Sequence, residues 1–377
     1  MSARVSVQVS TVASPPPAPK TVTGTLFITG VAATYPTGVQ KISGISQFRE
    51  LFGTRATENA ALHDAVQTFF AEGGSTCYVV AGDAPYGDDW STYLDQFTAD
   101  LGPGAVTIAG VGSTIAAAYL GDHCTETGRL GLICGPESQT AASAVSAAAT
   151  ASLETGADHL IYLWPWVSIP GLDDPIEPLG FAAGVRARAH SSAAGPAQSP
   201  LAAEYGTSRF VDGIETAVTD DEFTTLNTGT VSVVRVVSGK LRMYGWTCIA
   251  NPTGDTSGNL AGGQFRDLIN AIAWKATQIA ETYVGRIVDG RGVTMGEFSG
   301  DLTGVVAPYA ATGSLFARLD DEGRELDPGY VINVGEDVNP LDELAAGELK
   351  AEIGVRLSPT AEFITITIAA TDAAGSI

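Results

Sequence analysis

The sequence is poor in charged residues, and poorest in basic ones. Charged residues make up only 16% of the 377 positions, and 20 lysines and arginines stand against 42 aspartates and glutamates, so the net charge is −22. So acidic a chain repels the phosphates of nucleic acids and the headgroups of anionic lipids. We therefore expect no direct nucleic-acid partner. Hydrophobic residues reach 45%, which excludes disorder over the whole chain.

Long hydrophobic runs and cysteine pairs are also missing. No uninterrupted apolar stretch approaches the roughly 18 to 20 residues that span a bilayer, and the first residues lack a basic segment followed by an apolar one. We expect neither membrane insertion nor export by a cleaved signal. The cysteines form no CxxC pair and have small or apolar neighbours, which predicts reduced, buried thiols. They are Cys77, Cys124, Cys134 and Cys248.

The common enzyme signatures are absent as well. The sequence has no GxxxxGK[ST] phosphate loop, no HExxH and no GxSxG elbow. The loop GVGST at 110–114 follows a predicted strand, but it lacks the third glycine of a dinucleotide site, and turn geometry explains its glycines. Residues 206–208 faintly resemble the serine segment of subtilases, yet the bulky Arg209 and Phe210 follow. We predict no catalytic residue, no cofactor and no metal site.

The histidines and the acidic clusters do not change this prediction. His63, His123, His159 and His190 have no metal-ligand spacing. Asp122 and its neighbour His123 are interpreted as solvated helix surface, and the acidic clusters at 173–174 and 220–222 as solvated loop.

Strand and helix patterns alternate through the first two thirds of the chain. Predicted strands at 24–30, 77–82, 105–110, 129–136 and 159–167 are each followed by a helical pattern or a turn. This alternation favours a mainly parallel sheet covered on both faces. The segment 231–250 predicts a hairpin.

The last third begins with the longest predicted helix, about 263–288. Its apolar residues recur every three or four positions, so one stripe packs. The other side carries the polar residues, among them Arg266, Asp267, Asn270 and Lys275, and is expected to face outward.

Each end of the chain holds a strand pattern without an obvious partner. In RVSVQVS at 4–10 the residues Val5, Val7 and Val9 alternate with polar side chains, and the proline-rich spacer SPPPAPK prevents a tight hairpin. Near the other end, EFITITIAA carries Ile364, Ile366 and Ile368. Such strands either dock on their own domain or pair with other subunits by strand addition. The sequence leaves both readings open.

Several segments in order resemble contractile tail sheath proteins of bacteriophages and related injection particles. The resemblance is carried by TGTLFITGVAATYPTGVQKISGISQFRELFG, LHDAVQTFFAEGGSTCYVVAG, IYLWPWVSIPG, PLGFAAGVRARAH, NTGTVSVVRVVSGKLRMYGWTCIAN, FRDLINAIAWKATQIAETYVG and GELKAEIGVRLSPTAEFITITI. It spans nearly the whole chain. Trp164 stands where the family usually has tyrosine, and NPTGDTSGNL lacks the usual aromatic, arginine-rich run.

The resemblance implies an α/β fold, α+β overall, with four parts. These are an extended N-terminal arm (1–20), an N-terminal α/β subdomain (21–100), a non-catalytic α/β domain likened to subtilisin (101–250), and a C-terminal α+β sheath domain with a terminal exchange strand (251–377). It also implies strand exchange between subunits, through Val5, Val7 and Val9 in the arm and through Phe363, Ile364, Ile366 and Ile368 at the other end.

The function implied is structural and not enzymatic. Copies would form a helical contractile sheath, of stacked six-subunit rings, around a tail tube in the virion tail, assembled in the host cytoplasm. The sheath would contract to drive the tube through the target cell envelope. Tube, baseplate and tail terminator proteins are the implied partners, and Arg266 and Lys275 would face the tube. The alternatives are a tailocin or bacterial injection-system sheath and, in another class, an α/β hydrolase, in which polar groups would converge in one pocket.

Overall fold

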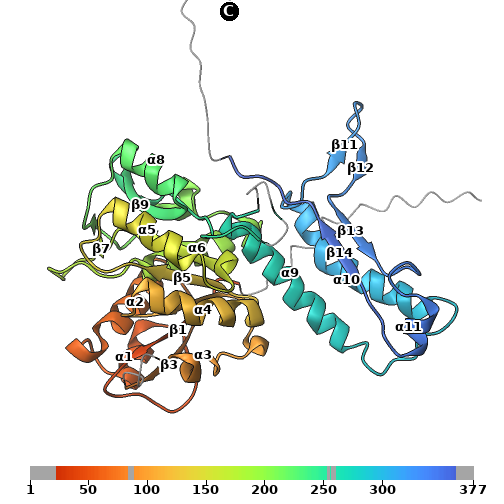
Figure 1. Cartoon of the computed structure of the whole chain (residues 1–377), viewed down its shortest axis with the longest axis horizontal. Coiled ribbons are helices and arrows are strands. Elements are labelled where there is room, and N and C mark those ends of the chain that lie inside the picture. Colours follow the sequence, from red (N-terminus) through yellow and green to blue (C-terminus); the bar gives the residue numbers. More distant parts are fainter. Residues whose placement is uncertain (1–22, 84–88, 253–254, 256–259, 362–377) are drawn as a thin grey trace, which may run out of the picture.

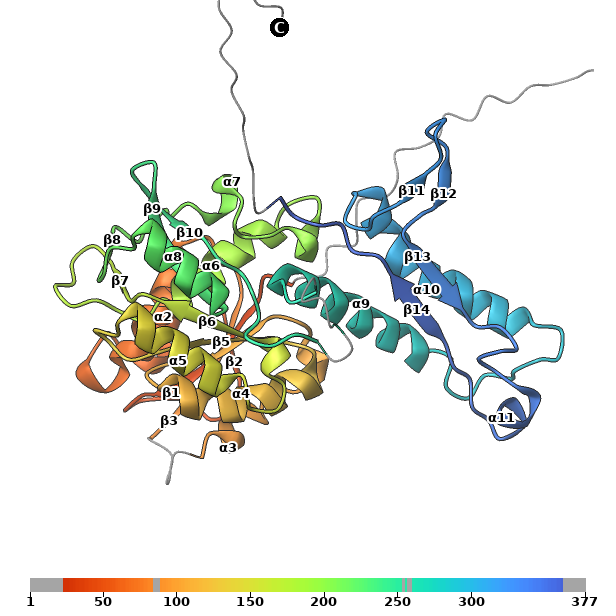
Figure 2. The same cartoon turned by 45° about the horizontal axis from the view of Figure 1, so that its top comes forward.

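The computed structural model describes residues 23–83, 89–252, 255 and 260–361. A larger domain runs to about residue 250, and a smaller one begins with helix α9 (Gly263–Glu281). Figure 1 and Figure 2 show α9 leaving the larger domain and running alongside the smaller one. The predicted strands of segments 4–10 and 363–370 lie outside the described residues.

One mixed sheet forms the centre of the larger domain. Its eight strands lie in the order β10-β9-β6-β5-β4-β1-β3-β2. Five neighbouring pairs are parallel, whereas β2 with β3 and β10 with β9 are antiparallel. The strands are β1 (Leu26–Val31), β2 (Gln40–Ile42), β3 (Cys77–Gly82), β4 (Ala105–Ile108), β5 (Leu130–Cys134), β6 (Leu160–Trp164), β9 (Val231–Val237) and β10 (Lys240–Met243).

Helices cover both faces of this sheet, as the alternation predicted. On β1, Leu26 and Ile28 belong to one buried cluster and Phe27 to the other, because successive side chains point to opposite faces. The first cluster includes side chains of α1 (Ile45–Phe52), α2 (Ala60–Ala71) and α6 (Leu179–His190). The second includes those of α3 (Ser91–Leu94), α4 (Ser113–Thr127), α5 (Ala141–Ala151) and α8 (Asp220–Thr228). The α/β fold is confirmed.

The predicted boundary at residue 100 falls inside this sheet. Strand β1, from the predicted 21–100 unit, pairs with β4 of the predicted 101–250 unit, with Ile28 opposite Thr107. The pairing joins segments about 80 residues apart, so the local sequence pattern gave no sign of it.

Short elements complete the larger domain. Strand β7 (Val167–Ser168) pairs with β8 (Gly213–Ile214), and α7 is Ala203–Gly206. Turns of 3-10 helix lie at Thr57–Asn59, Ala99–Leu101, Ala157–His159 and Gly195–Ala197.

The smaller domain packs two long helices against a two-stranded sheet. Leu268 and Ile272 of α9 meet Val306 and Tyr309 of α10 (Val293–Ala311) in one buried cluster, together with Ile353 of the sheet. The sheet pairs β13 (Tyr330–Asn333) with β14 (Glu352–Val355), a hairpin pairs β11 (Arg318–Leu319) with β12 (Glu325–Asp327), and α11 is Leu341–Ala345.

Two features of these helices differ from the sequence prediction. Helix α9 ends at Glu281 rather than near 288, because the chain turns there and Gly285 takes a left-handed backbone conformation with φ of 81°. Helix α10 was not predicted, because Gly296, Gly300 and Gly304 and the internal Pro308 lower its helix propensity.

Candidate functional site

The subtilase-like serine is a structural hydrogen-bond donor. Ser208 Oγ donates to Glu72 Oε1 at 2.7 Å, or to the carbonyl of Val211 at 2.7 Å. The Glu72 carboxylate is fully buried and also accepts from the backbone N–H groups of Arg209, Phe210 and Val211 at 2.9–3.0 Å, and from Arg188 Nη1 at 2.8 Å. Five donors thus hold one carboxylate, which fixes the loop on α2.

The GVGST loop also has an internal partner. The backbone N–H of Gly110 donates to both carboxylate oxygens of Glu177, at 3.0 and 3.2 Å. The N–H group that a bound phosphate would need as a donor is therefore already bonded to this carboxylate. Glu177 was not singled out in the sequence, where it reads as part of a proline-bounded loop.

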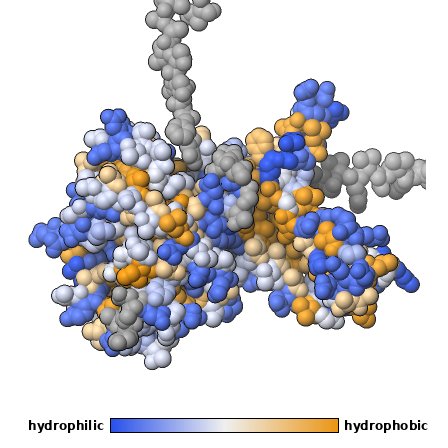
Figure 3. Space-filling view, in the orientation of Figure 1, coloured by the Kyte–Doolittle hydropathy of each residue, from blue (hydrophilic) through white to orange (hydrophobic). Residues whose placement is uncertain are grey.

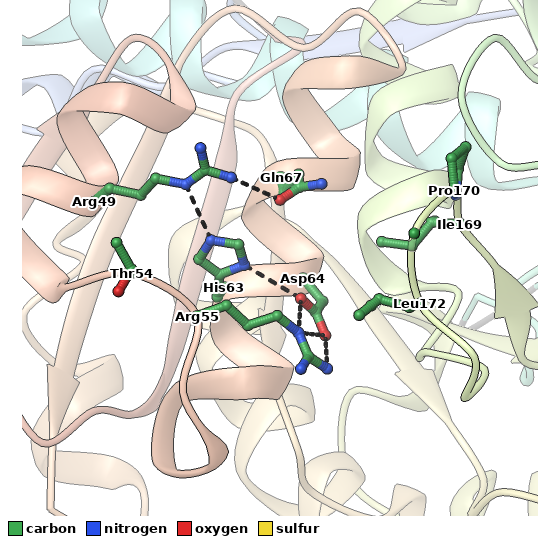
Figure 4. Close-up of a pocket in the computed structure, with 10 residues that line it drawn as sticks. Arg49, Thr54, Arg55, His63, Asp64, Gln67, Ile169, Pro170 and Leu172 are labelled. Atoms are coloured by element: carbon green, nitrogen blue, oxygen red, sulfur yellow. Dashed lines mark hydrogen bonds and ion pairs between the residues drawn. The ribbon is translucent and has the colours of Figure 1, made fainter.

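Two adjoining cavities lie at the carboxyl ends of the parallel strands, and Arg55 and Asp64 line both. Figure 4 shows the first, of about 340 Å³. There the Arg55 guanidinium donates to both Asp64 oxygens, at 2.8–3.0 Å, and His63 Nδ1 lies 3.2 Å from Asp64 Oδ1. Arg49 Nε donates to His63 Nε2 at 3.3 Å, so one ring nitrogen of His63 faces Arg49 and the other faces Asp64.

Electrostatics agree with this chain of contacts. Burial raises the pKa of Asp64, but hydrogen bonds from His63 and Arg55 outweigh it and hold the pKa below its usual value. Asp64 is therefore an ionised partner of Arg55. The polar side chains that converge in this cavity are hydrogen-bonded or ion-paired to one another, with Arg55 on Asp64 and Arg49 on His63 and Gln67.

The second cavity, of about 430 Å³, has largely apolar walls that include Val111, Trp166 and Ile176. It lies beside β1 and β4, where the chain connections leave the sheet in opposite directions, the usual ligand position in open α/β sheets. Glu177 lines it and is 9% exposed. Burial raises the pKa of Glu177 to about 7, and the hydrogen bond from Gly110 only partly opposes this.

A buried ion pair joins the two domains. Arg186 on α6 contacts Asp267 on α9, with Nε to Oδ2 at 2.9 Å and Nη2 to Oδ1 at 2.5 Å. Burial raises the pKa of Asp267, but Arg186 and His190 outweigh it and the pKa lies below its usual value. This corrects the prediction that Asp267 and Asn270 face outward: both are buried, at 3% and 6% exposure. The polar face of α9 packs on the larger domain because α6 supplies its counter-charge.

Both ends of the described chain meet this junction. The carbonyl of Thr23 accepts from Arg186 Nη1 at 2.8 Å, and His190 Nδ1 lies 2.9 Å from Thr23 Oγ1. At the other end, Gln264 Nε2 donates to Thr360 Oγ1 at 2.9 Å. Gln264 precedes Asp267 by one helical turn, so Thr23 contacts the ion pair itself and Thr360 contacts a residue one turn away from it.

The predicted tube-facing residues differ in their surroundings. Arg266 contacts Asp158 of the larger domain, donating to its carboxylate through Nη2 and to its carbonyl through Nε at 3.2 Å. Lys275 is half-buried over the ring of Trp274, at 5.2 Å from the centroid. The predicted exchange residues Val5, Val7, Val9, Phe363, Ile364, Ile366 and Ile368 lie outside the described part of the chain.

The histidine prediction needs one correction. Asp122 is exposed, but its neighbour His123 is buried against Arg129, with Nε2 3.2 Å from Arg129 Nη1. Burial and the Arg129 charge lower the pKa of His123 to about 4. Among the described residues, no group of three or more potential ligands is placed to hold a metal ion, and none of the helices has the length and apolarity to cross a membrane. All four cysteines are free and buried, as predicted.

Exposed large hydrophobic side chains concentrate in the smaller domain, and Figure 3 shows hydrophobic surface there. Val284 and Ile287 after α9 are 77% and 85% exposed, and Leu326 on the hairpin is 68% exposed. The β13–β14 sheet has two strands in the described chain, so each strand has one edge without a neighbour there. Both features are typical of surfaces that meet other chains.

Comparisons with known proteins place this architecture. The chain has the fold of contractile sheath proteins. It is similar to a sheath protein of PVC, an extracellular contractile injection system, solved in the contracted state, with 17% identity, a TM-score of 0.73 and 99% of each chain covered. It is similar to the contracted helical sheath of the anti-feeding prophage, with 16% identity, a TM-score of 0.70 and 98% of each chain covered.

A sheath tail protein from Listeria innocua has the same fold at greater distance, with 8% identity, a TM-score of 0.55, and 88% of this chain and 94% of that chain covered. No protein-family model matches the sequence, and neither does any curated protein. The similarity thus lies in the fold and covers both domains.

Proposed function

We propose that this chain is the structural subunit of a helical contractile sheath. One observation carries the proposal: the fold matches sheath subunits over 98–99% of both chains, smaller domain included. The chain acts without a catalytic centre. Its segments that resemble enzyme motifs are tied up in internal contacts, Ser208 with Glu72 and Gly110 with Glu177.

In the proposed sheath, the end segments link neighbouring copies. Strands with Val5, Val7 and Val9, and with Phe363, Ile364, Ile366 and Ile368, add to open sheet edges such as those of β13 and β14. The roots of both segments lie at the buried Arg186–Asp267 junction. Tension on either segment therefore enters the subunit where the two domains are joined.

Contraction then needs no nucleotide. Each subunit moves as a rigid body from one lattice to another of lower free energy, while backbone hydrogen bonds of the exchanged strands keep the copies linked. Small gains per subunit add up along the sheath. A tube protein fills the lumen, and baseplate and terminator proteins close the ends. Lys275 has no carboxylate partner in the described chain, which suits a contact with an acidic tube better than the paired Arg266.

The particle can be a phage tail or an injection system. The injection-system reading is favoured by TM-scores of 0.73 and 0.70 to PVC and the anti-feeding prophage, against 0.55 to the Listeria tail protein. The neighbouring genes decide between them: capsid and packaging genes indicate a virion tail, and their absence beside tube and baseplate genes indicates an injection system or tailocin.

Negative-stain electron microscopy of the purified chain tests the sheath function, with and without the neighbouring tube protein. We expect tubes or stacked rings. A chain that stays monomeric at every concentration, with tube protein present, contradicts the proposal.

The strand exchange is tested by deleting residues 2–12. The variant should give the far-UV circular dichroism of the full chain but form no polymer. Normal tubes from this deletion would remove the arm from the mechanism.

A further inference from the structure

Glu177 is a buried carboxylate with no basic side chain bonded to it among the residues that the structure describes. Its hydrogen-bond partner in the described chain is the Gly110 amide, which contacts both oxygens. The basic side chain that lines the same cavity, Arg55, is engaged by Asp64 through two contacts of 2.8 Å. A carboxylate accepts about four hydrogen bonds, so Glu177 retains acceptor capacity toward the cavity.

The cavity walls fit a particular kind of group. Val111, Trp166 and Ile176 give an apolar lining, and Glu177 places a buried carboxylate among them, while the exposed Glu137 and the Arg55-bound Asp64 also line the cavity. Lysine and arginine combine an apolar stem with a cationic head, and a buried carboxylate is stabilised by such a head. The cavity therefore suits a basic side chain better than a phosphate or a second carboxylate, which Glu177 would repel.

We propose that this cavity receives a lysine or arginine side chain from a second copy of this chain, and that Glu177 is its counter-ion. The inference rests on the proposed sheath function and names a contact of its lattice. Two copies of net charge −22 repel each other, so a specific attraction must offset that repulsion. Several basic side chains lack an ion-pair partner within the described part of one copy and are available for it: Lys41, Lys240, Lys275 and Arg291.

The symmetry of such a contact suits a helical array. The cavity and the inserted residue lie at different places on the chain, so each copy both gives and receives a side chain. When a copy gives its side chain to one neighbour and receives a side chain from another, the contact is heterologous and continues as rings or helices, whereas mutual exchange within one pair of copies would close a two-fold dimer.

The first test uses the isolated chain and n-butylammonium chloride as the probe. At pH 8, where Glu177 is ionised, NMR titration should detect millimolar binding. Glu177→Gln should weaken it at least tenfold, whereas Glu126→Gln, an exposed carboxylate on α4, should not. Equal binding by all three chains overturns the proposal. Circular dichroism and thermal melting establish that the variants are folded.

The second test measures the protein concentration needed for polymer. Glu177→Gln should raise it about tenfold and Glu126→Gln should leave it unchanged. If the wild type polymerises and Glu177→Gln does so at the same concentration, the inference fails and the sheath function stands. If the probe binds through Glu177 but neither the wild type nor the variants polymerise, even on tube protein, the sheath function fails. A second copy of the chain is then not the occupant of the cavity.

Discussion

Arg186 on α6 and Asp267 on α9 form a buried ion pair with two contacts, 2.5 and 2.9 Å long, between side chains that are 1% and 2% exposed. The same guanidinium holds the carbonyl of Thr23. One arginine thus connects the larger domain, the smaller domain and the root of the N-terminal segment. The two domains are expected to move together, because separating them would take each of these two charges away from its partner.

Asp267→Asn should destabilise the folded chain by about 3–5 kcal/mol, because it leaves the Arg186 charge buried without a counter-charge. Urea unfolding followed by tryptophan fluorescence measures this. The matched control is Glu297→Gln, which breaks an exposed pair with Arg286, 47% and 57% exposed, and should cost less than about 1 kcal/mol. Equal costs for the two variants would show that the junction does not hold the domains.

Glu72→Gln should cost more than Ser208→Ala. The glutamine leaves Arg188 without its buried counter-charge and turns an amide N–H₂ toward the backbone donors of 209–211. The free energy of unfolding should therefore fall by about 3 kcal/mol or more. Ser208→Ala removes one of several donors and should cost about 1 kcal/mol. Thermal melting of the two variants shows which one loses more stability. A greater loss in Ser208→Ala would indicate that Ser208 has a role beyond its hydrogen bond to Glu72.

Stability should depend on pH through Glu177. Its pKa of about 7 lies above the ordinary 4.5, so between these values the folded chain keeps a proton that the unfolded chain has released, and this group costs stability as the pH rises through that window. Glu177→Gln removes the cost. It should be more stable than the wild type by up to about 3 kcal/mol at pH 8 and nearly equal at pH 4. Urea unfolding at both pH values measures the difference, and an advantage that does not vary with pH would contradict this assignment.

The four thiols should be unreactive in the folded chain. All are buried, and burial raises their pKa values, that of Cys248 to about 12. At pH 8 the thiol reagent DTNB should therefore react slowly with the native protein and fully in 6 M guanidinium chloride. A fast native phase of one equivalent would mean that one cysteine is accessible.

Polymerisation should depend on salt. The net charge of −22 makes free copies repel one another, and added salt screens this repulsion. Between about 20 and 200 mM NaCl, the concentration needed for polymer should fall, as sedimentation would measure. If the protein concentration needed for polymer does not depend on ionic strength, the acidic residues serve general solubility and do not control assembly.

The sequence predicted those elements that depend on local periodicity. Strand β1 and strands β4 to β6, with helices α4 to α6, lie where the alternation placed them, because a residue's position within a repeat of two or 3.6 decides which face it buries. Burial of the cysteines followed from their apolar neighbours in the same way. Helix α10 was not predicted because its three glycines and its proline have low helix propensity. Packing against α9 and β13 stabilises the helix despite this low propensity.

The candidate sites depended on contacts between distant residues, and these only the tertiary structure decided. Asp267 reads as one more polar residue on an outward face until α6, 81 positions earlier, supplies Arg186. Glu72 and residues 209–211, like Glu177 and Gly110, meet across long stretches of chain. Net charge, the missing motifs and the sheath-like order of segments could be read directly, because they are sums or local patterns. Which charges became buried, and against what, was settled by the packing of α6, α9 and the sheet, since the environment of a side chain is set by its neighbours in space and not in sequence.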